Sequence, residues 1–282
     1  MVGIEGVGVR FHTPGVRRLR ILVVAMLLPA GETGLRGQSI VAYVEGPGVQ
    51  VTSVTSTSGV TTENFNWLSG GTYTSPVATA IGTYEGSSTS KFAIVSANQY
   101  GGAGGTGKYF AVGAESGSSA PVQLNLYAEA NYFGFWWSAG DRNNSITFLQ
   151  DGTALATFTT ATLVALLPKT AGATVTAING TTYSTTGYYG NPNNAQDSNE
   201  PFAYVDVIAT GLQFNQIQFA NTISTGFESD NHSVAAGVTG PGDGDVVVQN
   251  VELITPEPIP FTMMALGLVL IGGSRLRRHR AE

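Results

Sequence analysis

The chain has 282 residues, of which 42% are hydrophobic and 11% charged, and it contains no cysteine. This composition excludes an acidic disordered chain, a disulfide framework and any site that needs a thiolate. Residues 39–254 hold four basic residues against fifteen acidic ones, a balance of −11. We therefore expect no nucleic-acid partner, because no basic surface is present to displace phosphate counterions.

The N-terminal segment has the order of a secretory signal. Arg17, Arg18 and Arg20 precede an apolar run over residues 21–28, and small residues follow. Eight apolar residues are too few to span a membrane, which takes about 20. We expect residues 1–38 to be a leader and signal peptide that is removed after export. A buried helix is the alternative.

Short runs rich in Val, Ile, Thr, Phe and Tyr fill the middle of the chain and are separated by Gly, Asn, Asp and Ser. Such runs predict strands, and the alternation of Val122 and Leu124 with Gln123 and Asn125 indicates that one face of a strand is buried. The pattern predicts an all-β fold, with a single antiparallel β-sandwich of jelly-roll type over residues 39–254. Expected strands cover residues 49–55, 92–97, 109–114, 122–128, 132–139, 145–150, 154–160, 174–178, 202–210, 213–219, 232–238 and 245–254, and short helices are expected over 77–81 and 161–169.

Two turns rich in acids and amides are the candidates for a metal site. Asp141 and Asn144 lie in the first, and Glu228, Asp230 and Asn231 lie in the second. Carboxylate and amide oxygens suit Ca²⁺ in an export compartment, and residues 228 and 230 of a strand would point to the same face. The same residue types also form ordinary turns. Two expectations therefore stay open, a bound Ca²⁺ and no cofactor at all.

Trp136 and Trp137 are the candidates for stacking on a sugar ring. Adjacent residues of a strand face opposite sides, so only one indole can easily enter the core. An exposed indole in a secreted β-sandwich could bind polysaccharide. The alternative is that both are buried because the strand is covered on both faces.

His232 is the only histidine of residues 39–254, so a secreted hydrolase would have to use it as the base. No nucleophile elbow of the Gly-x-Ser-x-Gly kind accompanies it. One imidazole is also too few ligands for zinc.

The C-terminal segment places three features in order. Pro256, Glu257 and Pro258 come first, an apolar stretch over residues 259–273 follows, and the basic tail includes Arg275, Arg277 and Arg278. A helix of that length spans about 22 Å, short of a hydrocarbon core of roughly 30 Å. We expect a short transmembrane helix over this stretch, with its basic end in the cytoplasm. An ordinary tail anchor is the alternative.

Residues 255–282 resemble the PEP-CTERM sorting signal of Gram-negative bacteria. The segments 100–113, 132–144, 188–194 and 226–234 look like recurrent blocks of one family of exosortase-dependent surface proteins. The resemblance implies a chain that is exported, held briefly in the inner membrane, and processed by exosortase, a membrane protease. Its partners would then be the export machinery and exosortase. The resemblance implies no catalytic activity and transfers no site residues.

Three hypotheses follow from these features. The first is a non-enzymatic protein of the cell surface or the exopolysaccharide matrix. The second is a carbohydrate-binding module of lectin type, assisted by Ca²⁺ and using Trp136 or Trp137. The third is a secreted hydrolase that depends on His232.

Overall fold

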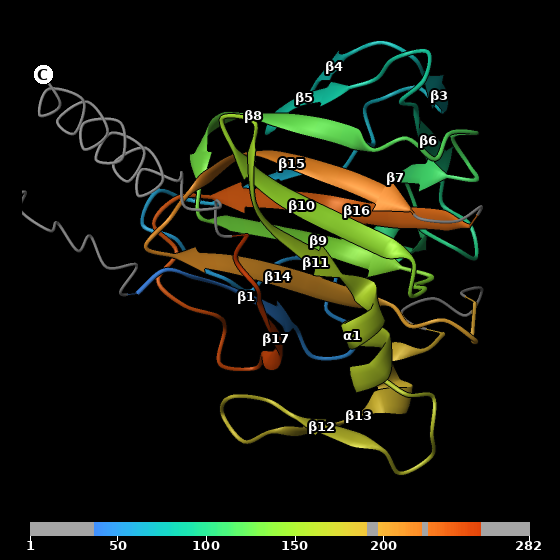
Figure 1. Cartoon of the computed structure of the whole chain (residues 1–282). Helices are drawn as coiled ribbons and strands as arrows, with labels where there is room; N and C mark the ends of the chain where they lie inside the picture. The colour runs from blue at the N-terminus through green and yellow to red at the C-terminus, as the bar shows by residue number, and fades with distance from the viewer. Residues whose placement is uncertain (1–36, 191–196, 222–224, 255–282) are drawn as a thin grey trace, which may run out of the picture. The chain divides into compact units, whose positions relative to one another are not determined.

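The computed structural model describes residues 37–190, 197–221 and 225–254. In this part of the chain the strands pair antiparallel throughout and form two large sheets and one small one (Figure 1). The predicted signal peptide and sorting signal lie outside the described residues. No helix among the described residues is long and apolar enough to cross a membrane.

The larger sheet has nine strands. Eight of them lie in the spatial order β17 (Val246–Val251), β1 (Ser39–Val44), β14 (Ala203–Thr210), β9 (Tyr132–Ser138), β16 (Gly226–Ala235), β7 (Lys108–Gly113), β6 (Phe92–Ser96) and β3 (Gly71–Tyr73). The ninth, β2 (Thr61–Glu63), pairs with the C-terminal part of β16. The first and last strands of the domain are therefore neighbours.

The second sheet has six strands. Their order is β11 (Thr153–Thr159), β10 (Asn144–Gln150), β15 (Phe214–Asn221), β8 (Val122–Ala130), β5 (Gly82–Glu85) and β4 (Val77–Ala78). The remaining elements are the helix α1 (Thr160–Leu166), the hairpin of β12 (Thr174–Thr176) and β13 (Thr182–Ser184), and two 3₁₀ turns, Ala103–Gly105 and Thr185–Tyr188.

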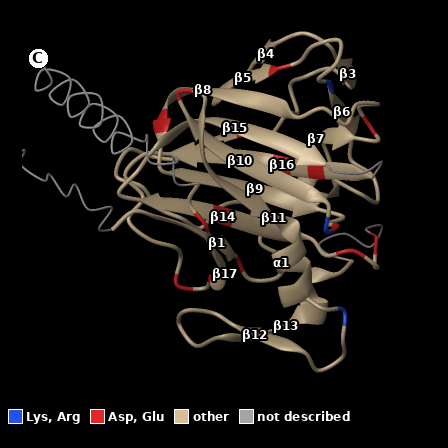
Figure 2. Ribbon diagram, in the orientation of Figure 1, with Lys and Arg blue, Asp and Glu red and all other residues tan. Residues whose placement is uncertain are grey.

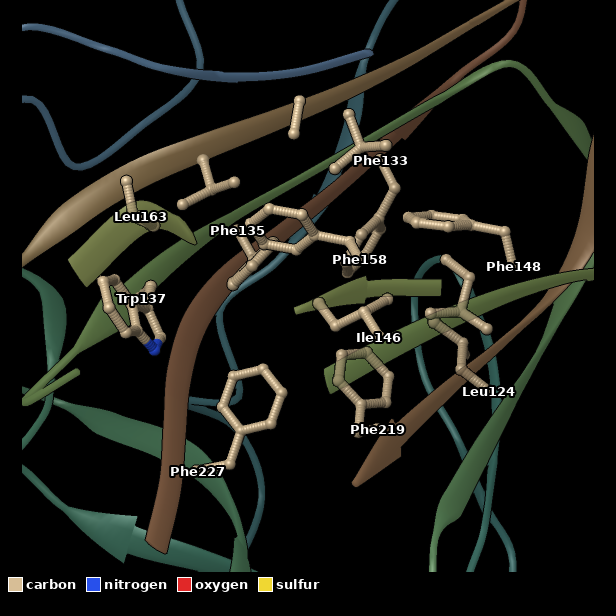
Figure 3. Close-up of a cluster of buried hydrophobic side chains, with 14 of the residues drawn as sticks. Leu124, Phe133, Phe135, Trp137, Ile146, Phe148, Phe158, Leu163, Phe219 and Phe227 are labelled. Atoms are coloured by element: carbon tan, nitrogen blue, oxygen red, sulfur yellow. The ribbon is translucent and has the colours of Figure 1, made fainter. Parts of the chain in front are cut away.

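The two large sheets pack face to face around an aromatic core. Strands β7 and β9 belong to the larger sheet, and β8 and β10 belong to the second sheet. This part of the chain therefore supplies core side chains from both sheets. The rings of Phe110 on β7 and Phe133 on β9 lie 5.2 Å and 5.8 Å from that of Phe219 on β15. Figure 3 shows part of this cluster. The all-β, sandwich-like fold is thus confirmed, and its jelly-roll topology stays a prediction.

Strand β9 is buried on both faces. Its inward residues, including Phe133 and Trp137, belong to the core between the sheets. Its outward residues are covered by two irregular segments: Val54 packs near Tyr132, and Ala103 packs against the cluster that contains Trp136. Side chains on this outer face are therefore withdrawn from solvent although they lie outside the sandwich core.

Several details of the predicted elements are wrong, and the short strands β2, β3, β5 and β13 were not predicted. Residues 49–55 form an irregular segment rather than a strand, and residues 77–81 contain β4 rather than a helix. Strand β1 was not predicted, although its residues alternate between half-buried and buried positions. The predicted helix over 161–169 is confirmed as α1.

Candidate functional site

Three buried carboxyl groups meet on the outer face of the nine-stranded sheet. We call Glu45, Asp206 and Asp245 the carboxylate triad. Glu45 follows β1 directly, Asp206 lies within β14, and Asp245 precedes β17. Because β1 pairs with both other strands, the sheet register brings the three together. One oxygen from each carboxyl group lies within 4.8 Å of the others.

Each carboxyl group of the triad accepts a hydrogen bond from a group outside the triad. The backbone N–H of Ser53 donates to Glu45 Oε1 at 2.6 Å, and that of Gly242 donates to Asp245 Oδ2 at 2.7 Å. The Tyr132 hydroxyl donates to Asp206 Oδ1 at 2.5 Å. The other oxygens of the two aspartates, Asp206 Oδ2 and Asp245 Oδ1, are buried and have no hydrogen-bond partner.

A glycine makes room for the tyrosine contact. Gly134 lies opposite Asp206 in the pairing of β9 with β14. A Cβ atom at position 134 would lie 2.0 Å from the Tyr132 hydroxyl and 2.8 Å from the Tyr204 ring. Only a residue without a side chain allows both tyrosines to lie over the sheet here.

The triad is electrostatically costly when it is charged. Burial raises the pKa of Asp206 well above its ordinary value, and the nearby charge of Glu45 raises it further. The same two causes raise the pKa of Asp245 to about 7, and burial raises that of Glu45. Two charged carboxylates at this separation repel by roughly 3 kcal/mol at an effective dielectric constant of about 20.

The two acid-rich segments that the sequence singled out come together in a second place, and the second of them, residues 228–231, lies within strand β16 rather than in a turn. Asp141 and Glu228 line one cavity of about 310 Å³, together with Glu115, Glu200 and Tyr100. We call this cavity the acidic pocket. Glu228 is buried, and burial together with the charge of Glu115 raises its pKa to about 10. Asp141 accepts hydrogen bonds from the backbone N–H of Asn143 and from the Thr225 hydroxyl.

The other three predicted ligands do not join this pocket. The Asn144 side chain is buried, accepts a hydrogen bond from Trp137 Nε1 at 3.0 Å and donates one to the Gly226 carbonyl. Asp230 accepts the backbone N–H groups of Ala103 and Asn231, and burial raises its pKa to about 7. Asn231 donates to the Gln50 carbonyl. The five residues therefore do not converge on one ion.

Of the two alternatives for Trp136 and Trp137, the structure bears out the one in which both indoles are buried, so neither is exposed to stack on a sugar ring. Trp136 is 1% exposed and Trp137 is 0% exposed. Both are buried because β9 is covered on its two faces. The exposed tryptophan is Trp67, at 62%, and its Nε1 donates to the Glu63 carboxylate at 3.0 Å. No feature of the sequence predicted that Trp67 would be the exposed indole.

His232 lies in the aromatic core rather than at a surface. Its Nδ1 lies 2.6 Å from the Tyr84 hydroxyl, and its Nε2 lies 2.9 Å from Ser229 Oγ. Its ring stacks on Phe219 at 5.1 Å. Burial lowers its pKa to about 3, so the imidazole is neutral at physiological pH. The His232–Ser229 pair is fully enclosed, because both side chains are 0% exposed.

Acidic side chains outnumber basic ones over the described residues (Figure 2). Two of the basic side chains make hydrogen bonds to neutral groups: Lys108 Nζ donates to the Asn66 backbone carbonyl, and Lys169 Nζ donates to the Asn199 side chain. The predicted sorting residues lie outside the described residues; they are Pro256, Glu257, Pro258, Arg275, Arg277 and Arg278.

Comparison with known proteins adds no assignment: no protein-family model, no curated protein and no solved structure matches this chain.

Proposed function

We propose that the chain is a non-enzymatic protein of the bacterial cell surface or exopolysaccharide matrix. On this proposal the signal peptide directs export, and the C-terminal helix then holds the chain in the inner membrane. Exosortase processes the chain near Pro256 to Pro258 and releases the sandwich domain to its final place.

One relationship between the ends of the domain carries the proposal. Ile40 in β1 pairs with Val251 in β17, so the chain enters and leaves the sheet on adjacent strands. Strand β1 begins at Ser39, directly after the predicted signal peptide, and β17 ends before Thr255. Proteases could therefore cut on both sides of the domain without breaking a strand. This arrangement is compatible with processing at both ends of the domain.

The site geometry favours a binding or structural role over hydrolysis. A hydrolytic base must reach its substrate within hydrogen-bond distance, directly or through one water. His232 is enclosed among aromatic rings, and its two nitrogens face Tyr84 and Ser229. The hydrolase hypothesis would therefore need the two sheets to separate.

Substitution of Glu257 tests the sorting proposal. In a Gram-negative host that carries exosortase, we expect Glu257→Gln to abolish display of the domain and to retain the C-terminal tail. The matched control is Glu252→Gln, an exposed glutamate five positions earlier, which should be displayed normally. Both variants should have the thermal midpoint of the parent chain. Normal display and processing of Glu257→Gln would overturn the proposal.

The acidic pocket favours a second candidate function, cation-assisted binding of a polysaccharide. Its lining includes Tyr100, which is 39% exposed, together with Asp141 and Glu200. Aromatic faces and bridging cations are common means of holding sugar hydroxyl groups. We expect glycan-array binding that chelator removes and that Tyr100→Ala abolishes, while Tyr127→Ala, at an exposed site of another surface, retains it. Binding unaffected by Tyr100→Ala would reject this pocket.

A further inference from the structure

We propose that the carboxylate triad of Glu45, Asp206 and Asp245 binds one Ca²⁺ ion on the outer face of the nine-stranded sheet. This inference is independent of the proposed function and of the acidic pocket. None of the three residues belongs to the two predicted metal clusters, and the turn over residues 242–245, which contains Asp245, was expected from the sequence to be a linker to the final strand that needs no metal.

The spacing of the oxygens fits a single ion. Calcium binds oxygen ligands at about 2.3–2.6 Å, so two oxygens on one ion lie no more than about 5 Å apart. The three carboxyl groups each place one oxygen within 4.8 Å of the others. One ion can therefore contact all three residues without moving the strands that carry them.

The hydrogen bonds leave one oxygen of each aspartate of the triad without a partner. Tyr132 and Gly242 each occupy one oxygen of an aspartate, and these contacts fix the orientation of the carboxylates. Asp206 Oδ2 and Asp245 Oδ1 then have no partner, although the side chains are 0% and 1% exposed. A buried carboxylate oxygen without a partner is costly, and a cation at this position would satisfy both.

Nearby charges supply no substitute for a cation. The charges that act on Asp206 are those of Glu45 and Asp245, and the charges that act on Asp245 are those of Glu45 and Asp243. No lysine or arginine is among them. A divalent ion would reverse this repulsion, because it turns three mutually repelling groups into ligands of one centre.

The donor set selects calcium among common cations. It contains only carboxylate oxygens, with no sulfur or imidazole nitrogen that would favour zinc. Magnesium keeps several of its water molecules and requires near-octahedral geometry, which a buried group of side chains on three separate segments supplies poorly. Calcium accepts irregular coordination, and the positions that the triad does not fill can be taken by water or by neighbouring hydroxyl groups.

The ion would fasten an irregular segment to the sheet. Glu45 begins the segment that crosses the outer face, and Ser53 of the same segment donates to it. Asp245 ends the loop before β17, while Asp206 belongs to the rigid β14. Calcium bound between them would stabilise both loops against the sheet.

Calcium titration of the full chain tests the site. After treatment with chelator, we expect calorimetry near neutral pH to show one tight Ca²⁺ per chain and thermal unfolding to shift upward with Ca²⁺ much more than with Mg²⁺. Asp245→Asn should weaken binding by at least about tenfold. Glu252→Gln, at an exposed acid that is not among the charges that act on the triad, should retain the parent affinity.

Further variants keep the test decisive. Glu45→Gln should also lose binding, which guards against a folding defect peculiar to Asp245→Asn. Without calcium, both variants should unfold at or above the temperature of the parent chain, because each removes one buried charge. Absence of heat and of any thermal shift with millimolar Ca²⁺ would overturn the proposal and leave the triad as a set of proton-sharing carboxyl groups. Loss of binding in Glu228→Gln with retention in Asp245→Asn would also overturn it, since the ion would then lie in the acidic pocket.

Discussion

Tyr132 on β9 donates its hydroxyl proton to Asp206 on the neighbouring strand β14, at 2.5 Å, on a face of the sheet that solvent does not reach. The contact joins a buried hydroxyl to a buried carboxyl group whose second oxygen has no partner. It therefore ties the orientation of a triad carboxyl group to the position of the neighbouring strand β9.

Removal of that hydroxyl should destabilise the protein. We expect Tyr132→Phe to lower the free energy of unfolding by about 1–3 kcal/mol, because it leaves a second oxygen of Asp206 buried and unpaired. Urea unfolding at neutral pH measures the loss. Tyr127→Phe is the control, since Tyr127 is exposed, and it should change stability very little. Equal stability of the two variants would show that the contact with Asp206 contributes nothing.

The buried carboxyl groups predict an unusual pH dependence. In calcium-free solution we expect stability to fall as the pH rises from about 4, the ordinary pKa of aspartate, to about 7. Burial raises the pKa of Asp230 and Asp245 to about 7, so the folded state binds more protons than the unfolded state across that range. The stabilisation from these two protonated aspartates is complete below pH 4 and is lost as the pH rises through 7. The pKa of Glu228 is raised to about 10, so its deprotonation extends the loss of stability to higher pH.

His232 changes stability with pH in the opposite sense, but it is one group against three carboxyl groups with raised pKa values. Its pKa is lowered to about 3, so its contribution is present above its unfolded value of 6.5 and is lost as the pH falls through 3. Several titratable groups interact electrostatically with these two aspartates. For Asp245 they are Glu45, Asp206, Asp243, Tyr43 and Tyr188, and for Asp230 they are Glu63 and Tyr84. Urea unfolding in chelator at several pH values measures the balance. Stability that rises steadily from pH 5 to pH 8 would contradict it.

Truncation of His232 should damage the core. We expect His232→Ala to lower the free energy of unfolding by about 2–4 kcal/mol, because it opens a cavity and leaves the Tyr84 hydroxyl without its partner. Ser229→Ala removes only one hydrogen bond and should lower it by about 1 kcal/mol. Guanidinium unfolding of both variants makes the comparison. A His232→Ala variant as stable as Ser229→Ala would show that the ring is not packed as described.

Tryptophan fluorescence tests the burial of β9. Acrylamide should quench the emission of Trp67, while Trp136 and Trp137 should be protected. We expect Trp67→Phe to remove most of the readily quenched emission and Trp137→Phe to leave it in place. Strong quenching in the Trp67→Phe variant would mean that an indole on β9 is accessible to ligands after all.

Clear alternation of apolar and polar residues predicted strand β8, whereas β9 and β14, which are buried on both faces, were predicted from runs of aromatic and β-branched residues. Val122 and Leu124 are buried and Gln123 and Asn125 are half-buried, as a period of two requires. The segment 49–55 has similar composition but forms no strand. Its side chains bond their own backbone instead, as where Thr52 Oγ1 accepts the N–H of Val54. Such local competition is not visible in a count of β-branched residues.

The triad could not be predicted because its members are distant in sequence. Only the pairing of β1 with β14 and β17 brings Glu45, Asp206 and Asp245 together. One signal was present: Asp206 interrupts an apolar run in a strand whose neighbours Val205 and Val207 are both fully buried. A lone acid in such a strand must be buried with a partner. By contrast, Asp141 and Glu228 were singled out from the sequence as members of two separate candidate clusters, and the structure places both in the lining of one pocket.

The most direct test of the proposed function is the intact mass of the mature protein recovered from the surface or medium of an exosortase-bearing host. The account predicts a chain that begins after the signal peptide, near residue 39, and ends within or just beyond Pro256 to Pro258. Recovery of surface protein that still extends to Glu282 would contradict it.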